Sequence, residues 1–356
     1  MTAPRPTQPR MLGLFEKRID GDDCLLELAR RRFQAAGMGA EMHAGTPEQL
    51  EGALKFRPGP DAPVALHLPR NCNWADENSR RRIVEFAANF AGRIHGMVLH
   101  DQVDLVARPE NFLRAARELN SRLQPIGRCP RLFVEYATGL EPGVFANFFE
   151  SVRGLEHISA CIDVSHVGIS QAQRAYAQLH PGEDICALKS QPSHLPHVMA
   201  DVDAAVNSAL PTVLDLIAAI GALGKPVHFH LHDGHPLSTF SPFGVSDHLS
   251  FLAEIPLGFE YRGRRSAPLM FGPAGLSKMV AHALQTIGAA RVSFTLEIHP
   301  TADRLPLGDA AALFGHWRDK TNAEKMHHWL AVLEANHRLL QAAVSPNRIP
   351  QTPHEH

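Results

Sequence analysis

The residues best suited to chemistry lie in the stretch V-H-F-H-L-H-D-G-H, at positions 227–235. In a β-strand, side chains alternate between two faces, so His228, His230 and His232 would share one face, opposite Phe229 and Leu231. Imidazole is a common ligand of divalent metals. A histidine buried in a strand can equally serve a structural hydrogen bond, so residues of the other strands must decide between these interpretations.

Short apolar runs alternate with longer amphipathic segments, which is the pattern of βα units around a parallel sheet. The expected strands cover residues 11–15, 40–43, 63–68, 96–100, 131–136, 158–163, 226–232 and 291–297. Helical spacing is found in 22–36, 78–91, 109–123, 143–152, 212–223 and 274–287. This alternation predicts a single α/β domain over residues 11–344, folded as a (β/α)8 TIM barrel.

Two segments interrupt the pattern. Residues 171–209, after the sixth expected strand, are less regular and include the Pro- and His-rich string S-Q-P-S-H-L-P-H, so we expect an excursion above the barrel. A long loop is expected after the seventh strand, over 234–273. Residues 1–10 and 345–356 are polar and contain proline, which predicts a disordered tail at each end.

Composition narrows the class of protein. The formal charge of the 356 residues is -2, so no overall basic field attracts a polyanion, although a local patch would suffice for nucleic acid. The five cysteines are widely spaced and form no CxxC pair, which favours a reducing, cytoplasmic location. No run of 18 apolar residues occurs, so no membrane partner is expected. Assembly into a homo-oligomer is left open.

Ligand-type side chains gather where the expected strands end, and the carboxyl ends of barrel strands form the active-site face. These residues are His43, His67, His100, Glu135, Asp163, His230 and Glu297, with His166 three positions after Asp163. Imidazole and carboxylate together bind Zn, Mn, Fe or Co. Because buried carboxylates without a cation are costly, we expect Glu135, Asp163, His230 and Glu297 to close on one divalent ion.

Four strings closely resemble the barrel superfamily of endonuclease IV and xylose-isomerase-like proteins. They are F-V-E-Y-A-T-G at 133–139, C-I-D-V-S-H at 161–166, F-H-L-H-D at 229–233 and L-E-I-H-P at 296–300. Their order and strand placement also match, and the resemblance spans roughly residues 60–300. It implies one to three divalent ions of Mn, Zn, Co or Mg as the cofactor, with the catalytic ion held between Glu135 and Glu297.

The endonuclease IV branch implies a zinc-dependent phosphodiesterase with nucleic acid as its partner. Its trinuclear site also uses histidines at the ends of strands three and four, which His67 and His100 match, and His166 matches as well. Its D-x-H pair after strand seven is replaced here by Asp247 followed directly by His248. Its G-E-G motif is replaced by F-G-P-A-G at 271–275, so the third zinc site departs from the pattern.

The isomerase and epimerase branch needs one ion, and there Glu135 and Glu297 would move a proton between adjacent carbons of a metal-held hydroxy-ketone. We prefer this hypothesis, with a small carbohydrate-like substrate, because of the near-neutral charge, the altered third-metal motif and the breadth of the branch. The phosphodiesterase is the second hypothesis and a non-catalytic metal-binding barrel the third. The expected substrate-binding residues are Arg262, Arg264, His232 and Asp233.

Overall fold

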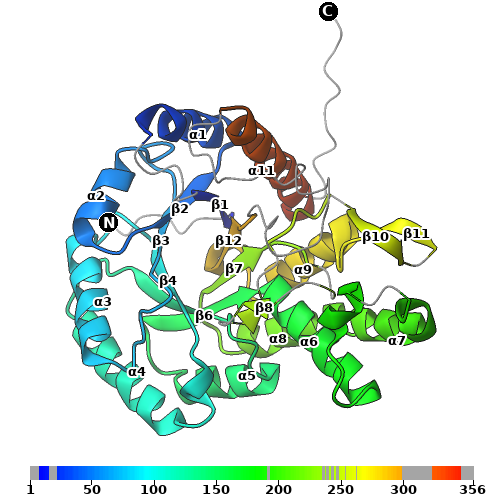
Figure 1. Cartoon of the computed structure of the whole chain (residues 1–356). Helices are drawn as coiled ribbons and strands as arrows, with labels where there is room; N and C mark the ends of the chain where they lie inside the picture. The colour runs from blue at the N-terminus through cyan, green and yellow to red at the C-terminus, as the bar shows by residue number, and fades with distance from the viewer. Residues whose placement is uncertain are drawn as a thin grey trace, which may run out of the picture.

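Eight parallel strands close into a barrel in the order β1-β12-β7-β6-β5-β4-β3-β2, and helices surround it (Figure 1). The computed structural model describes residues 8–15, 22–190, 193–234, 237, 240–241, 244–245, 248–252, 254–261, 263–298 and 323–345. The predicted (β/α)8 TIM barrel is therefore confirmed.

Each barrel strand begins and ends within one residue of the expected range. The strands are β1 (Arg10–Phe15), β2 (Gly39–His43), β3 (Val64–His67), β4 (Gly96–His100), β5 (Arg131–Glu135), β6 (Ile158–Asp163), β7 (Val227–Leu231) and β12 (Val292–Leu296). Strands that are buried on both faces read as nearly continuous apolar runs, which is why their bounds are visible in the sequence. Because β1 begins at Arg10, the described structure already includes part of the expected amino-terminal tail.

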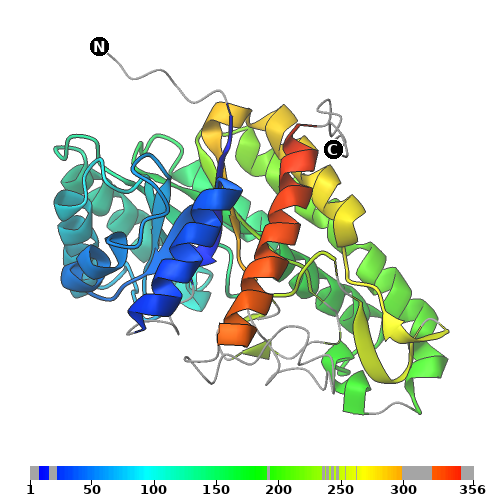
Figure 2. The same cartoon turned by 90° about the horizontal axis from the view of Figure 1, so that it is seen from above.

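The helices begin and end at recognisable signals. They are α1 (Asp23–Ala36), α2 (Pro47–Leu54), α3 (Glu77–Asn89), α4 (Pro109–Leu123), α5 (Pro142–Ser151), α6 (Val164–Leu179), α7 (Leu195–Asn207), α8 (Ala209–Gly221), α9 (Gly272–Thr286) and α11 (Ala323–Val344), with short 3-10 turns η2 (Val103–Leu105), η3 (Ile185–Ser190) and η4 (Ala289–Arg291). The Asp22 carboxylate caps α1 by accepting the Leu25 N–H at 3.0 Å, and Gly37 ends it at φ 69°. Helices α1 and α11 pack side by side, which closes the ring of helices (Figure 2).

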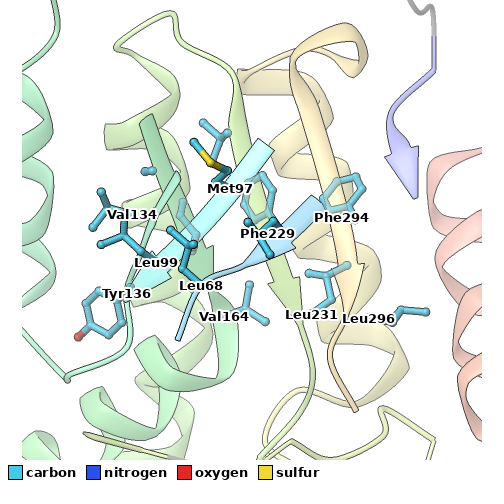
Figure 3. Close-up of a cluster of buried hydrophobic side chains, with 14 of the residues drawn as sticks. Leu68, Met97, Leu99, Val134, Tyr136, Val164, Phe229, Leu231, Phe294 and Leu296 are labelled. Atoms are coloured by element: carbon cyan, nitrogen blue, oxygen red, sulfur yellow. The ribbon is translucent and has the colours of Figure 1, made fainter. Parts of the chain in front are cut away.

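The strands carry two kinds of side chain on their two faces. Figure 3 shows Phe229 and Leu231 of β7 beside Phe294 and Leu296 of β12 in the apolar cluster around the barrel. The rings of Phe229 and Phe294 lie 5.2 Å apart. With the period of two along β7, the intervening His228 and His230 face the barrel interior, so packing of the outer face sets the direction of the histidines.

The segment after β6 is more regular than expected, so the prediction of an irregular stretch over 171–209 was wrong for much of its length. Helix α6 starts directly after β6 and runs to Leu179, and η3 and α7 together cover much of the remainder. Tyr176 of α6 packs with Leu195 and Val202 of α7 in a small second core. Pro196 lies in the first turn of α7, where proline is tolerated, and therefore does not interrupt the helix.

The expected long stretch after β7 contains two hairpins, formed by β8 (Phe240–Ser241) with β9 (Gly244–Val245) and by β10 (Ile255–Tyr261) with β11 (Arg264–Ala267). The longer hairpin projects from the side of the barrel near α7 (Figure 1). It lies away from the strand ends of the first half of the barrel.

Residues Leu195–Gly221, which comprise α7 and α8, are long and apolar enough to cross a membrane by length and composition alone. Of the apolar 18-residue stretch within this range, 44% is buried inside the protein, and α8 packs against α5, α6 and α9. A core helix has the same composition, so this is weak evidence for a membrane span. The absence of a membrane partner stays a prediction.

Candidate metal centre

Six side chains of the predicted site lie together at the carboxyl ends of the strands. His67, His100, Glu135 and Asp163 are the last residues of β3, β4, β5 and β6, His230 is next to last in β7, and Glu297 directly follows β12. The strand register pairs His100 with Glu135 and Asp163 with His230, which brings neighbours in the barrel side by side. Together with His166, His232 and His248, these side chains form three ligand groups.

The first ligand group consists of His67, His100 and Glu135. The Nε2 atoms of His67 and His100 are 3.2 Å apart, and they lie 3.7 and 3.4 Å, respectively, from Oε2 of Glu135. Tetrahedral zinc with bonds of about 2.0–2.1 Å holds its nitrogen and oxygen ligands about 3.3 Å apart. The three donor atoms therefore already have nearly the spacing that one such ion requires.

The second ligand group consists of Glu135, Asp163, His230 and Glu297, whose donor atoms all lie within 4.8 Å of one another. Nδ1 of His230 is 2.7 Å from Oε2 of Glu297 and 3.4 Å from Oε1 of Glu135. Even so, the described residues offer no hydrogen bond of good geometry to His230 Nδ1 or to Glu135 Oε2, and both atoms are buried. Buried polar atoms that lack a well-aligned hydrogen bond and lie among three carboxylates fit a divalent cation.

The third ligand group consists of Asp163, His166, His232 and His248, all buried. Oδ2 of Asp163 lies 2.7 Å from Nε2 of His232 and 3.6 Å from Nδ1 of His166. The D-x-x-H spacing explains the position of His166, because the Asp163 side chain caps α6 by accepting the His166 N–H at 2.9 Å. The rings of His232 and His248 stack at 4.2 Å. This group contains His248 of the expected pair together with His232, whereas Asp247 lies outside the described residues.

Two carboxylates connect the three groups. Glu135 belongs to the first and the second, and Asp163 to the second and the third. A carboxylate has two oxygens and can bind one ion with each. The groups are thus joined in series and together offer donors for up to three ions.

Electrostatics leave the first group ready for a cation. Burial alone would raise the pKa of Glu135, but the neighbouring His100 and His230 lower it to about 2, so the carboxylate is ionised. Burial lowers the pKa of His100 to about 4 and also lowers that of His166, so both imidazoles are neutral and keep a lone pair. Neutral imidazole and ionised carboxylate are the forms that bind metals.

His230 is electrostatically different. Burial would lower its pKa, but Cys161 and the carboxylates of Glu41, Glu297 and Glu135 raise it well above the ordinary value. Without a metal, this imidazole therefore carries an extra proton. A metal ion that binds Nδ1 has to displace that proton, so binding in the second group releases acid.

The predicted substrate-binding residues do not gather at one place. Arg264 is exposed on β11 and lies 3.5 Å from Glu254, whereas Arg262 and Asp247 lie outside the described residues. His232 and Asp233 are completely buried, and their expected contact with a substrate stays a prediction. His232 also belongs to the third ligand group.

Asp233 has a structural task. Its carboxylate accepts the backbone N–H groups of Gly234, Phe271 and Gly272 at 2.8, 3.1 and 2.7 Å and so ties the end of β7 to the start of α9. Burial raises its pKa to about 7. These contacts show that Asp233 supports the end of β7.

Sequence reasoning missed Glu41 on β2, which is completely buried inside the barrel. Its carboxylate contacts His67 and His230, which belong to two different ligand groups. The signal was present, because strand alternation puts Glu41 on the same face as His43. His43 itself lies beside His67, with ring centroids 4.7 Å apart, and belongs to none of the three groups.

A scan against protein-family models finds no match, and neither does a search of the curated proteins. Among solved structures, the crystal structure of AsfvAP:AG is similar over 95% of this chain and 99% of that chain, with a TM-score of 0.51 and 13% identity.

Two other solved structures have TM-scores below 0.5. The endo-beta-1,4-mannanase from Thermotoga petrophila is 8% identical at a TM-score of 0.45, covering 94% of this chain and 77% of that one. The carboxyl transferase domain of Rhizobium etli pyruvate carboxylase with 3-hydroxypyruvate is 12% identical at 0.39, covering 95% and 48%. At these identities a likeness shows the fold alone. The chain is a (β/α)8 barrel that is similar in fold to AsfvAP, and buried His, Glu and Asp groups that suit divalent metal ions lie at its strand ends.

Proposed function

We propose that this chain is a metal-dependent phosphodiesterase that cleaves nucleic acid at abasic sites. One observation carries the proposal: Glu135 and Asp163 join three ligand groups in series. A proton-transferring isomerase needs one ion and the two glutamates, and would leave the first and third groups without a task. The fold likeness to AsfvAP, an AP endonuclease, supports the same choice over the isomerase that the sequence favoured.

The division of labour follows from the donor sets. When bound, divalent ions would supply hydroxide at neutral pH and neutralise charge that develops on the phosphoryl oxygens. His67, His100 and Glu135 would hold one ion, the group around His230 and Glu297 a second, and the group around His166 a third. Burial of these side chains excludes bulk water and strengthens each electrostatic contact.

A cavity beside the first ligand group offers room for a substrate. It has a volume of about 540 Å³ and is lined by residues that include His43, Gln49, Lys55 and His67. Lys55 adds a positive charge and Gln49 a neutral polar side chain. Most protein contacts to nucleic acid are made to phosphate and sugar by such groups, so we place part of the nucleic-acid backbone here.

Metal analysis combined with an incision assay tests the proposal. We expect purified protein to hold two or three ions per chain, to nick a duplex with a single abasic site, and to lose this activity on chelation and regain it with zinc. An otherwise identical duplex without the abasic site is the control. A single labile ion per chain, together with no incision under any metal, would overturn the proposal.

One observation keeps the isomerase as a second candidate. Glu135 and Glu297 both belong to the second ligand group, and both are buried around His230. Two such carboxylates beside one ion could take and return a proton. Incubation of the protein with a panel of ketoses in deuterated water tests this. If no ketose takes up deuterium, the isomerase is removed as a candidate.

A further inference from the structure

We propose that Glu41 is a positioning residue: a single carboxylate oxygen holds the rings of His67 and His230 and dictates that the two histidines bind metal through opposite ring nitrogens. It would thereby link the first ligand group, through His67, to the second, through His230. The inference rests on the proposed metal-dependent function, although its test reads metal binding and not only activity.

The geometry around Oε1 of Glu41 supports this role. This oxygen lies 2.8 Å from Nδ1 of His67 and 2.9 Å from Nε2 of His230. The two imidazole rings stack, with centroids 5.5 Å apart and planes inclined by 23°. One oxygen from β2 therefore fixes two rings that come from β3 and from β7, on the other side of the barrel.

The second oxygen anchors the carboxylate itself. Oε2 accepts the Thr295 hydroxyl at 2.7 Å and lies 3.0 Å from Nε2 of His228. Nδ1 of His228 is in turn 2.6 Å from the Ser293 hydroxyl, which can donate to it. Each oxygen thus has two donors, and the side chain of Glu41 has no freedom to turn.

The direction of each hydrogen bond follows from the charge of the carboxylate. Its two oxygens have four donor contacts, from His67 and His230 at Oε1 and from Thr295 and His228 at Oε2, and this arrangement suits an ionised carboxylate. An ionised carboxylate only accepts, so His67 donates through Nδ1 and His230 through Nε2. This leaves Nε2 of His67 and, once a metal has displaced its proton, Nδ1 of His230 as the atoms with a lone pair for a metal.

These two atoms are the ones that face the ligand groups. Nε2 of His67 lies 3.2 Å from Nε2 of His100, in the first group. Nδ1 of His230 lies 2.7 Å from Oε2 of Glu297, in the second. A carboxylate behind a ligating histidine also makes the imidazole a better donor, and loss of such a partner weakens metal affinity about 10- to 100-fold.

The competing interpretation makes Glu41 a ligand, because Glu41, His67 and His230 could themselves hold an ion. An ion there would displace two hydrogen bonds of good length. Because a neutral imidazole has one lone pair, such an ion would also leave Nε2 of His67 and Nδ1 of His230 protonated and unable to bind in the first and second groups. The two interpretations differ in the number of ions lost when the carboxylate is replaced.

The first experiment compares Glu41→Gln with Thr295→Val, both in a His166→Ala background that lacks the third group. Zinc affinity is measured by competition with a chelator, and bound metal is counted after dialysis. We expect Glu41→Gln to keep the number of ions but to weaken the affinity of both by about 10- to 100-fold. Thr295→Val, which removes one donor on the Oε2 side, should stay within about twofold of the background. Circular dichroism of the metal-free proteins controls for folding.

The second experiment reads the ring nitrogens directly. In zinc-loaded wild-type protein, long-range ¹H–¹⁵N spectra should show His67 protonated at Nδ1 and bound through Nε2, and His230 protonated at Nε2 and bound through Nδ1. A merely structural carboxylate would not require opposite tautomers. Coordination of His230 through Nε2 would overturn the inference even if Glu41→Gln failed to fold.

The outcomes separate this inference from the proposed function. Wild-type protein that binds no zinc removes the proposed function and the inference together. Wild-type protein that binds zinc, with a Glu41→Gln variant of equal affinity, removes the inference alone. Loss of one whole ion in Glu41→Gln, with the other unaffected, makes Glu41 a ligand and also overturns it.

Discussion

The two ends of the barrel interior use the same strands for opposite purposes. At the carboxyl ends, β5 and β6 present Glu135 and Asp163, which belong to the ligand groups. Toward the amino ends, β4, β5 and β6 present Val98, Phe133 and Cys161, which pack as a separate apolar cluster. We call these levels the ligand layer and the apolar layer. One step of two residues along a strand moves a side chain from one to the other, so height along the strand decides what a residue can do.

Histidines of β7 show the same rule inside one strand. His230 faces the carboxylates of the ligand layer, whereas His228, two residues earlier, bonds to Ser293 and Glu41 and lies 5.3 Å from the Phe133 ring. Burial lowers the pKa of His228, while surrounding charges raise that of His230. Residue type alone therefore does not distinguish a ligand from a structural histidine.

Replacing Glu135, which belongs to both the first and the second ligand group, should have the largest effect on the ligand layer. We expect Glu135→Gln to lose binding in the first and second groups and to lower activity by more than about 100-fold, since even partners of ligands cost that much. Metal counts and incision rates measure this. Because the change also relieves crowding of carboxylates, the metal-free variant should unfold no more easily than metal-free wild type. Retained activity would place the chemistry elsewhere.

The apolar layer should respond in the opposite way. Phe133→Ala removes a buried ring and is expected to reduce the free energy of unfolding by about 3–5 kcal/mol, while a protein that still folds keeps its full complement of metal. Denaturant unfolding and metal counts on the same sample measure both quantities. Lost metal with unchanged stability would show that the two layers are not separable.

Metal removal tests whether the ligand layer also stabilises the fold. With free zinc at about 1,000 times the dissociation constant, one bound ion adds about 4 kcal/mol to the free energy of unfolding. Chelation should remove this amount from wild type for each ion that it holds. Glu135→Gln should lose less on chelation, because it has fewer ions to lose. Equal losses in both proteins would contradict the assignment of Glu135 to two groups.

A buried lysine near the amino ends should give the smallest effect. Lys225 donates to the carbonyls of Val152 and Leu155 at 3.2 and 2.7 Å, and burial lowers its pKa to about 8 from 10.5. At a pH between these two pKa values, Lys225 is mostly protonated in the unfolded chain and mostly neutral in the folded one. The free energy of unfolding therefore rises with pH in this range, by at most about 1.4 kcal/mol per pH unit.

The difference in unfolding free energy between wild type and Lys225→Met isolates this group. It should rise from pH 8 to 10 and stay flat from pH 5 to 7. A flat difference over the whole range would show that the ammonium is solvated. Metal content should not change in this variant, in contrast to Glu135→Gln.

Sequence alone determined the barrel and the membership of much of the ligand layer. Buried parallel strands are short apolar runs, and their carboxyl ends meet at one face, so a ligand type at the end of each run was enough to collect His67, His100, Glu135, Asp163 and Glu297. D-x-x-H also placed His166, because a capping aspartate and the first turn of its helix are local neighbours. The same local reasoning missed α6, whose apolar positions begin inside that motif.

Only the tertiary structure decided how the ligands divide. Local spacing says which face a side chain takes but not which side chain meets it across the barrel, since that depends on the stagger of the strands. The contact between Glu41 of β2 and His230 of β7 therefore cannot be predicted from the spacing of residues in either strand. His232 joins Asp163 and His248 for the same reason, and this contact makes the third ligand group independent of the spacing between Asp247 and His248.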